Sequence, residues 1–278
     1  MKFTKMHGIG NDFVMVNGFK ESGHDWPDTS RAVCDRRFGI GSDGLIVAFP
    51  GEREQFSMRM WNPDGSESEM CGNGVRCFAK FLHQEGLTNE TSIPVETGAG
   101  RLCLDIMGDQ VRVDMGPARL TRGEIGVTGV PGSKMINEPL TLELGEGPSV
   151  ELLGTAVSMG NPHIVFFWED VDAVPLEKYG PLIERHELFP NRINAHFVQV
   201  LSPTEIKMRT WERGAGVTLA CGTGACACGV ASFMNGKTDR TVHVHLPGGS
   251  LHIDYLATGR VNMTGPAVTV FEGNWAAT

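Results

Sequence analysis

Short apolar segments separated by turn residues recur along the whole chain. Many follow the two-residue alternation of a strand with one buried face. In the first half of the chain they predict strands at 12–18, 44–49, 56–61, 92–97, 101–106 and 110–115. In the second half they predict strands at 163–168, 195–201, 205–211, 241–246, 250–256 and 260–263. Because the connections are mostly of hairpin length, antiparallel or mixed sheets are favoured over βαβ winding.

Helical patterns are fewer. Each half has one clear helix, expected at Val75–Glu85 and at Ala225–Asn235, directly after a Cys-Gly-x-Gly sequence. A second helix in each half is expected near Thr29–Phe38 and Leu176–Arg185. The predicted fold class is α+β, with a curved, mostly antiparallel or mixed sheet around a central helix in each half.

The two halves resemble one another at an offset of 150 residues. Cys71, Gly72 and Gly74 coincide with Cys221, Gly222 and Gly224 at this offset. The same offset aligns Met58, Arg59 and Trp61 with Met208, Arg209 and Trp211, and Gly10-Asn11 with Gly160-Asn161. Glycine-rich composition would explain isolated glycine matches, but not Trp, Arg, Asn and Cys in register together. We therefore predict an internal duplication and two halves related by pseudo-two-fold symmetry.

Composition excludes several classes of function. The chain has 278 residues, 41% of them hydrophobic, and a net charge of −9, with no strongly basic stretch. We therefore expect neither nucleic acid nor a membrane surface as a partner. The sequence from Met1 lacks the pattern of a signal or transit peptide, and no apolar run approaches the length of a membrane span. A cytoplasmic location is the expectation.

The seven cysteines form no C-x-x-C pair, and a disulfide framework is not expected in a chain of this kind. Most are expected to be buried thiols, including at least one of Cys226 and Cys228. Three other motifs are weak. The sequence GIGSDG at 39–44 has a helix before it and a strand after it, the reverse of a dinucleotide site. GKT at 236–238 lacks the first glycine of a phosphate loop, and His243 with His245 has no third metal ligand nearby in the sequence.

Cys71 and Cys221 are the candidate catalytic groups. Each lies at a predicted helix start, where free N–H groups and the helix dipole stabilise a thiolate and can also hold a carboxylate. If the pseudo-symmetry brings the two helix starts together, one thiolate could remove the α-proton of an amino acid while the opposite thiol delivers a proton to the other face. Preorganised amides would hold the carboxylate charge, so no metal and no other cofactor is required. A single cysteine before a helix is more often structural, but the repeated register favours catalysis.

These motifs identify the chain as similar to the diaminopimelate epimerases. The resemblance runs nearly end to end through MHGIGNDFV, RFGIGSDGL, NPDGSESEMCGNGVRC, ETGAG, MGNPH, RINAHFV, WERGAGVTLACGTGACA and TGPA. It implies a cofactor-independent epimerase that interconverts LL- and meso-diaminopimelate in lysine biosynthesis by a two-base, thiolate–thiol mechanism. It also implies an active site in the cleft between the two halves.

The resemblance further implies roles for individual residues. Cys71 and Cys221 would be the acid/base thiols. His163 and Glu212 would tune the pKa values of these thiols. The substrate-binding positions would be Asn11, Asn62, Gly72, Asn73, Asn161, Asn194, Glu212, Arg213, Gly222 and Thr223.

Two positions depart from the family pattern. Gly44 stands where some members have a substrate-contacting Gln, and Phe271 stands where some have a Tyr associated with dimer contacts. A homodimer is still the expectation. The expected domains are 1–120, completed by 268–278, and 121–267, with the polar segment Thr121–Asn137 as the crossover.

Two alternatives are separable by experiment. An epimerase of the related proline racemase type would act on a substrate without a distal charge, which Glu212, Arg213 and the four Asn side chains argue against. A thiol redox sensor or an amino-acid-binding protein would use the same site without catalysis.

Overall fold

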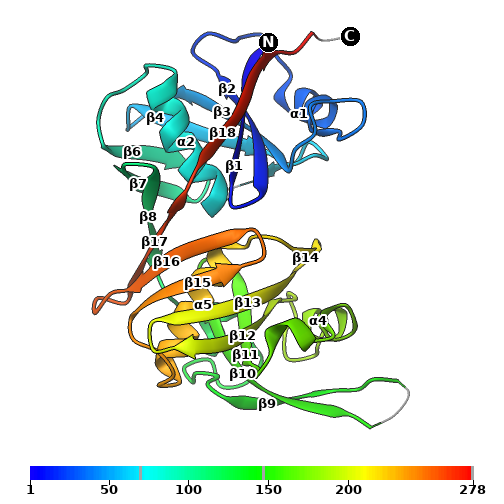
Figure 1. Ribbon diagram of the computed structural model, residues 1–278. Helices are drawn as coiled ribbons and strands as arrows, with labels where there is room; N and C mark the ends of the chain where they lie inside the picture. Colours follow the sequence, from blue (N-terminus) through cyan, green and yellow to red (C-terminus); the bar gives the residue numbers. More distant parts are fainter. Residues whose placement is uncertain (69–70, 146–147, 277–278) are drawn as a thin grey trace. The chain divides into compact units, whose positions relative to one another are not determined.

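The computed structural model describes residues 1–68, 71–145 and 148–276. They form two compact units (Figure 1): unit 1 comprises residues 1–114 and 264–278, and unit 2 comprises residues 115–263. Residues 69–70 of the EMCGNG motif and the last two residues of the expected 268–278 segment lie outside the described residues. The segment Thr121–Asn137 lies wholly within unit 2. The crossover therefore occurs earlier, inside strand β8 (Gln110–Pro117), which runs on from one unit into the other.

Unit 1 is a mixed sheet with two helices. Its strands are β1 (Lys2–Gly8), β2 (Asn11–Asn17), β3 (Gly44–Pro50), β4 (Phe56–Trp61), β5 (Glu67–Ser68), β6 (Ser92–Thr97), β7 (Gly100–Met107), most of β8, and β18 (Val268–Asn274). The pairs β2–β3 and β4–β6 are parallel, whereas β1–β2, β3–β4, β4–β5, β6–β7, β7–β8 and β1–β18 are antiparallel. The helices are α1 (Trp26–Cys34) and α2 (Gly72–Gln84).

Unit 2 repeats this plan. Its strands are β9 (Glu138–Leu142), β10 (Val150–Ser158), β11 (Pro162–Phe167), β12 (Asn194–Ser202), β13 (Glu205–Glu212), β14 (Gly216–Thr218), β15 (Thr241–Leu246), β16 (Gly249–Tyr255) and β17 (Arg260–Pro266), the last continuing into unit 1. Its helices are α3 (Arg122–Ile125), the 3-10 turn η1 (Val171–Ala173), α4 (Leu176–Glu184) and α5 (Gly222–Met234).

Strand register confirms the duplication residue by residue. Phe13 pairs with Gly44 in the parallel β2–β3 ladder, and His163 pairs with Asn194 in the parallel β11–β12 ladder. Leu45 faces Trp61 across β3–β4, and Ala195 faces Trp211 across β12–β13. Each partner in the second pair is 150 residues after its counterpart in the first. The predicted α+β class with duplicated halves is therefore confirmed.

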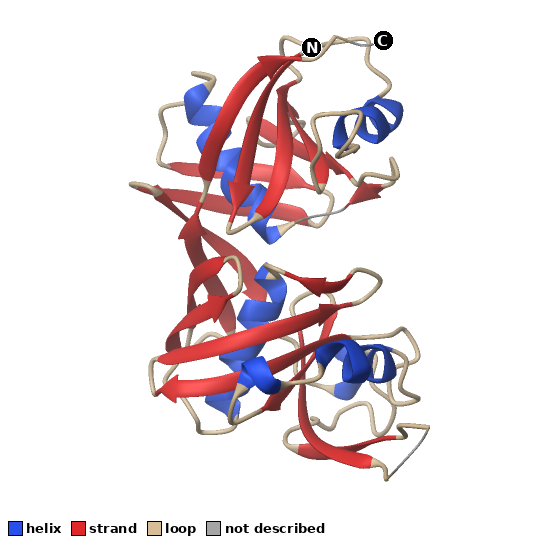
Figure 2. Ribbon diagram, turned by 45° about the vertical axis from the view of Figure 1, so that its right-hand side comes forward, coloured by secondary structure: helices blue, strands red, loops and turns tan. Residues whose placement is uncertain are grey.

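One long helix lies among the strands of each unit (Figure 2). Helix α2 contacts β1, β2, β3 and β7, while α5 contacts β10, β11, β12, β13, β15 and β16. Almost every residue from Gly222 to Ser232 is buried, as expected for a helix that is apolar all round. Cys226 and Cys228 are both fully buried, so both belong to the core.

The predicted strands are all present, but the pattern missed β1, β5, β9, β10, β14 and β18. Strand β1 is obscured by Lys5, which is only 6% exposed and forms an ion pair with Asp12. Helix α1 begins earlier than predicted because Asp25 is its N-cap and accepts a hydrogen bond from the amide of Asp28. It also ends earlier, at Cys34.

Candidate active site

The duplicated cysteines occupy equivalent caps. Cys71 is the N-cap of α2 and Cys221 is the N-cap of α5, both with extended backbone at φ −132° and −124°. Both thiols lie next to the amides of a first helical turn.

A glycine turn places an asparagine beside each cysteine. Gly10 and Gly160 adopt positive φ, 88° and 99°, which an L-residue rarely does. The following residues, Asn11 and Asn161, lie at the start of β2 and directly before β11. The repeated Gly-Asn pair is thus explained by the turn.

In unit 1, Asn11 presents an acceptor to the thiol. The Cys71 Sγ–H donates to Asn11 Oδ1 at 3.4 Å, and the Asn73 amide donates to the same oxygen at 3.1 Å. The Asn11 Nδ2 donates to Asp43 Oδ2 at 2.6 Å, which fixes the amide in this orientation. We call Cys71, Asn11, Asn73 and Asp43 the N-terminal half-site.

Charged residues hold Asp43 in place. Arg36 Nη2 lies 2.7 Å from both Asp43 Oδ1 and Asp12 Oδ1, and the buried Lys5 ammonium lies 2.6 Å from Asp12 Oδ2. Burial opposes ionisation of Asp12, but hydrogen bonds from Arg36 and Lys5 prevail and lower its pKa to about 2. No local motif marks this network, because its members are spread between residues 5 and 43 of the chain.

A buried guanidinium braces the first turn of α2. Arg76 has no exposed surface, and it donates to the Gly72 carbonyl oxygen at 3.1 Å and to Asn73 Oδ1 at 3.0 Å. It also donates to the Pro266 carbonyl oxygen at 3.2 Å. Arg76 therefore orients Asn73, whose amide faces Asn11. In the sequence, the one feature that sets Arg76 apart is its position in the middle of an apolar helical stretch.

In unit 2, a different set of partners surrounds Asn161. Its Oδ1 lies 2.9 Å from His163 Nε2, and its Nδ2 donates to Thr223 Oγ1 at 3.3 Å. The Thr223 hydroxyl lies 3.8 Å from Cys221 Sγ. The other ring nitrogen of His163, Nδ1, lies 2.9 Å from His196 Nε2.

The line of contacts ends at a third buried side chain. His196 Nδ1 lies 2.9 Å from Thr210 Oγ1. We call Cys221, Thr223, Asn161, His163, His196 and Thr210 the C-terminal half-site. His196 and Thr210 were missed by sequence analysis, because each lies within a strand and resembles an ordinary core position.

Burial keeps both imidazoles neutral. His163 and His196 have no exposed surface. Burial lowers the pKa of His163 well below its ordinary value, with smaller contributions from His196 and Arg213, and it lowers the pKa of His196 to about 3. Each neutral ring therefore carries one N–H and one acceptor nitrogen.

Opposing effects act on the Cys221 thiol. Burial raises its pKa well above the ordinary value, and the Glu212 carboxylate adds to this. The Gly224 N–H and the Thr223 hydroxyl act in the opposite direction, because hydrogen bonds to sulfur favour the thiolate. Glu212 acts on the thiol through its charge.

Glu212, Arg213 and Asn194 lie around one turn. Asn194 is buried, and it donates to the Pro162 carbonyl oxygen at 2.9 Å and accepts from the Arg213 amide at 2.9 Å. The Thr218 hydroxyl donates to Glu212 Oε1. The exposed Arg213 guanidinium donates to the Asn191 carbonyl oxygen at 3.0 Å. The Asn194 side chain thus holds the turn through hydrogen bonds to the backbone of Pro162 and Arg213.

The predicted position Asn62 and the departing position Gly44 both have neighbours from unit 1. Asn62 follows β4, and its Nδ2 donates to Ser66 Oγ at 3.0 Å. At Gly44, an added Cβ would lie 2.8 Å from Met60 Cε and 3.1 Å from the Trp61 carbonyl oxygen. The space beside Gly44 is therefore filled by its own unit.

No cluster of three or more His, Cys, Asp or Glu side chains suited to a metal is found among the described residues. His245 forms hydrogen bonds with Ser250 and Glu205. His243 packs edge-on against His252, with the ring centroids 4.7 Å apart. In the described segments, no helix is long and apolar enough to cross a membrane.

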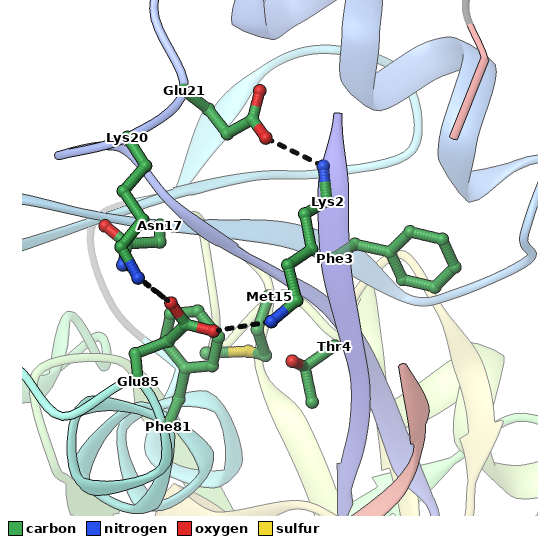
Figure 3. A pocket seen from close by; sticks show the side chains of 9 residues that line it. All are labelled: Lys2, Phe3, Thr4, Met15, Asn17, Lys20, Glu21, Phe81 and Glu85. Atoms are coloured by element: carbon green, nitrogen blue, oxygen red, sulfur yellow. Dashed lines mark hydrogen bonds and ion pairs between the residues drawn. The ribbon is translucent and has the colours of Figure 1, made fainter. Parts of the chain in front are cut away.

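A pocket in unit 1 contains none of the predicted site residues (Figure 3). Glu85, one of its lining residues, accepts hydrogen bonds from Asn17 at 2.8 Å and from Lys20 at 2.9 Å, and it pairs with Lys2 at 3.5 Å. The charges of Glu85 and its neighbours are thus already matched within the chain, which favours a structural role for this pocket.

Comparison with known proteins gives one family. A family model described as diaminopimelate epimerase matches residues 3–121 and 155–270, ranges that include both cysteines. The diaminopimelate epimerase of Pelotomaculum thermopropionicum is 51% identical over 282 residues, covering 99% of each chain. Among solved structures, a PhzF-family phenazine biosynthesis protein of Bacillus anthracis aligns with a TM-score of 0.69 at 16% identity, covering 100% of this chain and 99% of the other. A probable proline racemase of Agrobacterium radiobacter aligns with a TM-score of 0.68 at 14% identity, covering 100% and 93%. These two structural likenesses concern the fold alone.

Proposed function

The chain belongs to the diaminopimelate epimerase family, and from this membership we propose a cofactor-independent, two-base epimerisation of LL- and meso-diaminopimelate in lysine biosynthesis. The observation that carries the mechanism is that the two cysteines occupy equivalent N-cap positions, at the starts of α2 and α5. Equivalent groups in equivalent frames suit a reaction that must run in both directions.

In the proposed mechanism, the thiolate of one cysteine takes the proton from the α-carbon. The electron pair of the broken C–H bond passes to the α-carbon and is delocalised into its carboxylate. The thiol of the other cysteine then donates its proton to the opposite face, so that the configuration is inverted and the two sulfurs exchange protonation states. In the reverse reaction Cys71 and Cys221 exchange roles.

The first-turn amides of α2 and α5 are proposed to hold the reacting carboxylate. In this proposal the amides of Gly72, Asn73, Gly222 and Thr223 donate to it. Helix N-termini bind anions because their N–H groups are unsatisfied and the helix dipole is positive there. Such donors also stabilise the charge that develops on the carboxylate as the α-proton leaves.

The polar side chains are proposed to recognise the rest of the substrate. Diaminopimelate has a second ammonium and a second carboxylate, which Glu212 and Arg213 complement in charge. The asparagines at 11, 62, 161 and 194 would supply donors and acceptors, and His163 with Glu212 would tune the thiols. The Asn194 contacts described above suggest that this residue also acts by holding the Arg213 turn.

We propose units 1 and 2 as the two domains, with the substrate bound by both Cys71 and Cys221. A homodimer and a cytoplasmic location remain part of the proposal. Strand β18 exposes Val268, Val270 and Phe271, the last at 48% exposure, although Phe271 also packs edge-on against Phe3 at 5.8 Å. An apolar strand of this kind could be covered by a second copy, which size-exclusion chromatography with light scattering would detect.

A proline-type substrate is the alternative that the fold itself permits, because a probable proline racemase shares it. Glu212 and Arg213 argue against it, since proline has no distal charge. The test is to supply the purified protein with LL-diaminopimelate and with L-proline, each without added cofactor, and to follow the stereoisomers by chiral chromatography. Conversion of LL-diaminopimelate alone is expected. Conversion of proline alone, or of neither, would overturn the proposal.

A further inference from the structure

The C-terminal half-site contains an unbroken line of hydrogen-bonding groups that has no counterpart among the described residues of unit 1. It joins Thr210, His196, His163, Asn161, Thr223 and Cys221 through heavy-atom distances of 2.9, 2.9, 2.9, 3.3 and 3.8 Å. All members lie in unit 2. The positions equivalent to the two histidines are Phe13 and Ile46, which cannot form hydrogen bonds.

Neutral imidazoles make such a line directional. Each ring donates through one nitrogen and accepts through the other, so one tautomer determines the next. In one direction the Thr210 hydroxyl donates to His196, His196 donates to His163, and His163 Nε2–H donates to Asn161. In the other direction every donor and acceptor is exchanged.

The buried hydroxyl of Thr210 favours the first direction. Thr210 is only 3% exposed, and His196 is the sole hydrogen-bond partner of its side chain within the described parts of the chain. In the first direction its hydrogen points at His196 Nδ1. In the second it would have no acceptor, which is costly for a buried polar group.

The direction decides what reaches the Cys221 sulfur. When His163 donates to Asn161 Oδ1, the Asn161 Nδ2–H faces Thr223, and the Thr223 oxygen accepts this bond. The Thr223 hydroxyl hydrogen is then directed to Cys221. In the second direction, the Asn161 amide would be reversed and would take the Thr223 hydroxyl hydrogen for itself.

We propose that Thr210 and His196 are positioning residues. The Thr210 hydroxyl fixes His196 as the Nε2–H tautomer, and His196 fixes His163 in the same tautomer. The Thr223 hydroxyl is thereby directed to Cys221 as a hydrogen-bond donor. This deepens the proposed function, because it rests on Cys221 acting as an acid/base group. Unit 1 has the opposite arrangement: Asp43 fixes Asn11 so that the amide presents an acceptor to Cys71. The repeated asparagine therefore acts differently in the two units: Asn11 accepts a hydrogen bond from Cys71, whereas Asn161 orients the Thr223 hydroxyl toward Cys221.

Other groups that act on Cys221 do not depend on this line. Glu212 on β13 and burial both raise the pKa of the thiol, while the Gly224 N–H on α5 lowers it. Loss of the hydrogen bond from Thr223 should therefore raise the pKa of the Cys221 thiol further. Reactivity of Cys221 should fall, and that of Cys71 should not.

The first experiment needs no substrate. Two-bond ¹H–¹⁵N spectra of the histidine rings report which nitrogen carries the proton. We expect His163 and His196 of the wild-type chain to be Nε2–H tautomers. Observation of Nδ1–H on either ring would overturn the inference, whether or not the protein epimerises diaminopimelate. Conversely, absence of epimerisation with Nε2–H tautomers present would contradict the proposed function only.

The second experiment removes the origin of the line. Thr210→Val keeps the shape of the side chain and loses the hydroxyl, whereas Thr210→Ser keeps the hydroxyl. In Thr210→Val we expect mixed tautomers, and a fall of about three- to tenfold in the alkylation rate of Cys221, measured by mass spectrometry with Cys103 as an internal reference, because a single hydrogen bond of ordinary strength is lost. We expect kcat to fall by a similar factor and KM to change by less than about twofold.

Ser232→Ala is the matched control. Ser232 is a fully buried hydroxyl on α5 with no hydrogen-bond partner among the described residues, so its removal tests for a general effect of deleting a buried hydroxyl. We expect wild-type tautomers in Ser232→Ala and in Thr210→Ser. Wild-type tautomers and wild-type Cys221 reactivity in Thr210→Val would overturn the inference. If Thr210→Val fails to fold, the wild-type spectrum still decides.

Discussion

The two half-sites have the same backbone and different surroundings. In both, a cysteine caps a buried helix and an asparagine follows a glycine turn. In unit 1, a cluster of charged residues holds the asparagine, and apolar side chains lie beneath the helix. In unit 2, two neutral histidines take the place of the apolar side chains. The duplicated halves thus share a backbone frame, whereas the side chains around the two cysteines differ.

The glycines in the two helices locate this difference. A Cβ added at Gly74 would lie 2.7 Å from Ile46 Cδ1 and 3.6 Å from Phe13 Cζ. A Cβ added at Gly224 would lie 2.4 Å from His196 Cε1 and 2.9 Å from Cys221 Sγ. The side chains beneath the helices are therefore structural equivalents, and the pairs Phe13–Ile46 and His163–His196 can be compared directly.

Removal of either sulfur is expected to have the largest effect. Cys71→Ser and Cys221→Ser should each lower kcat for epimerisation by about 10²-fold or more, because each removes one member of an acid/base pair. The rates are measured by chiral chromatography from both stereoisomers. Full activity in either variant would show that its thiol is not required. Only one of the two half-sites would then take part in proton transfer.

Replacement of the histidines by their unit 1 counterparts should alter the response to acid. The pKa of His196 is about 3 in the folded protein, against about 6.5 in the unfolded chain. Between these values the unfolded state binds the proton and the folded state does not, so stability falls as pH falls. The slope is about 1.4 kcal/mol per pH unit for each such histidine, and His163 contributes in the same direction.

The variant that tests this combines His163→Phe with His196→Ile. Urea denaturation between pH 6.5 and pH 4.5 should show wild-type stability declining more steeply than that of the double variant. The difference in slope is expected to reach about 2.7 kcal/mol per pH unit. Parallel curves would mean that the histidines are not held neutral in the fold. The unit 1 change Phe13→Leu serves as a control for core repacking without titration.

Adding a methyl group beneath each helix should give a smaller and unequal effect. Gly224→Ala must displace the packed ring of His196, whereas Gly74→Ala meets the end of the flexible Ile46 side chain. We expect Gly224→Ala to lower the free energy of unfolding by about 1–3 kcal/mol and Gly74→Ala to lower it by less. Urea denaturation at neutral pH measures both. An equal or larger loss for Gly74→Ala would contradict the packing described here.

The repeat in the sequence predicts most of the repeated elements of the fold, but not the equivalent strands β1 and β10 or β5 and β14. The register that joins Cys71 to Cys221 also placed Asn11, Asn161 and the flanking strands. Strand β1 was missed because it has polar residues whose burial depends on partners elsewhere in the chain. Lys5 is an example, since its ion pair with Asp12 becomes visible only when β1 and β2 are adjacent.

The same reason explains which site residues were missed. Asp43, Arg76, His196 and Thr210 act through contacts with other side chains rather than through a local motif. All four lie at positions where the halves differ: Asp43 stands opposite Ile193, Arg76 opposite Cys226, His196 opposite Ile46, and Thr210 opposite Met60. A search for repeated residues overlooks such positions. Comparing where the repeats disagree would have found them.

Solvent deuterium labelling tests the central claim, that two distinct thiols act on one α-carbon. The reaction is run in D₂O from each stereoisomer and stopped at low conversion, and the α-deuterium content of product and of recovered substrate is measured by mass spectrometry. Two bases predict deuterium in the product and almost none in the recovered substrate, from both directions. Equal labelling of recovered substrate and product, or transfer of the original proton into the product, would contradict the account.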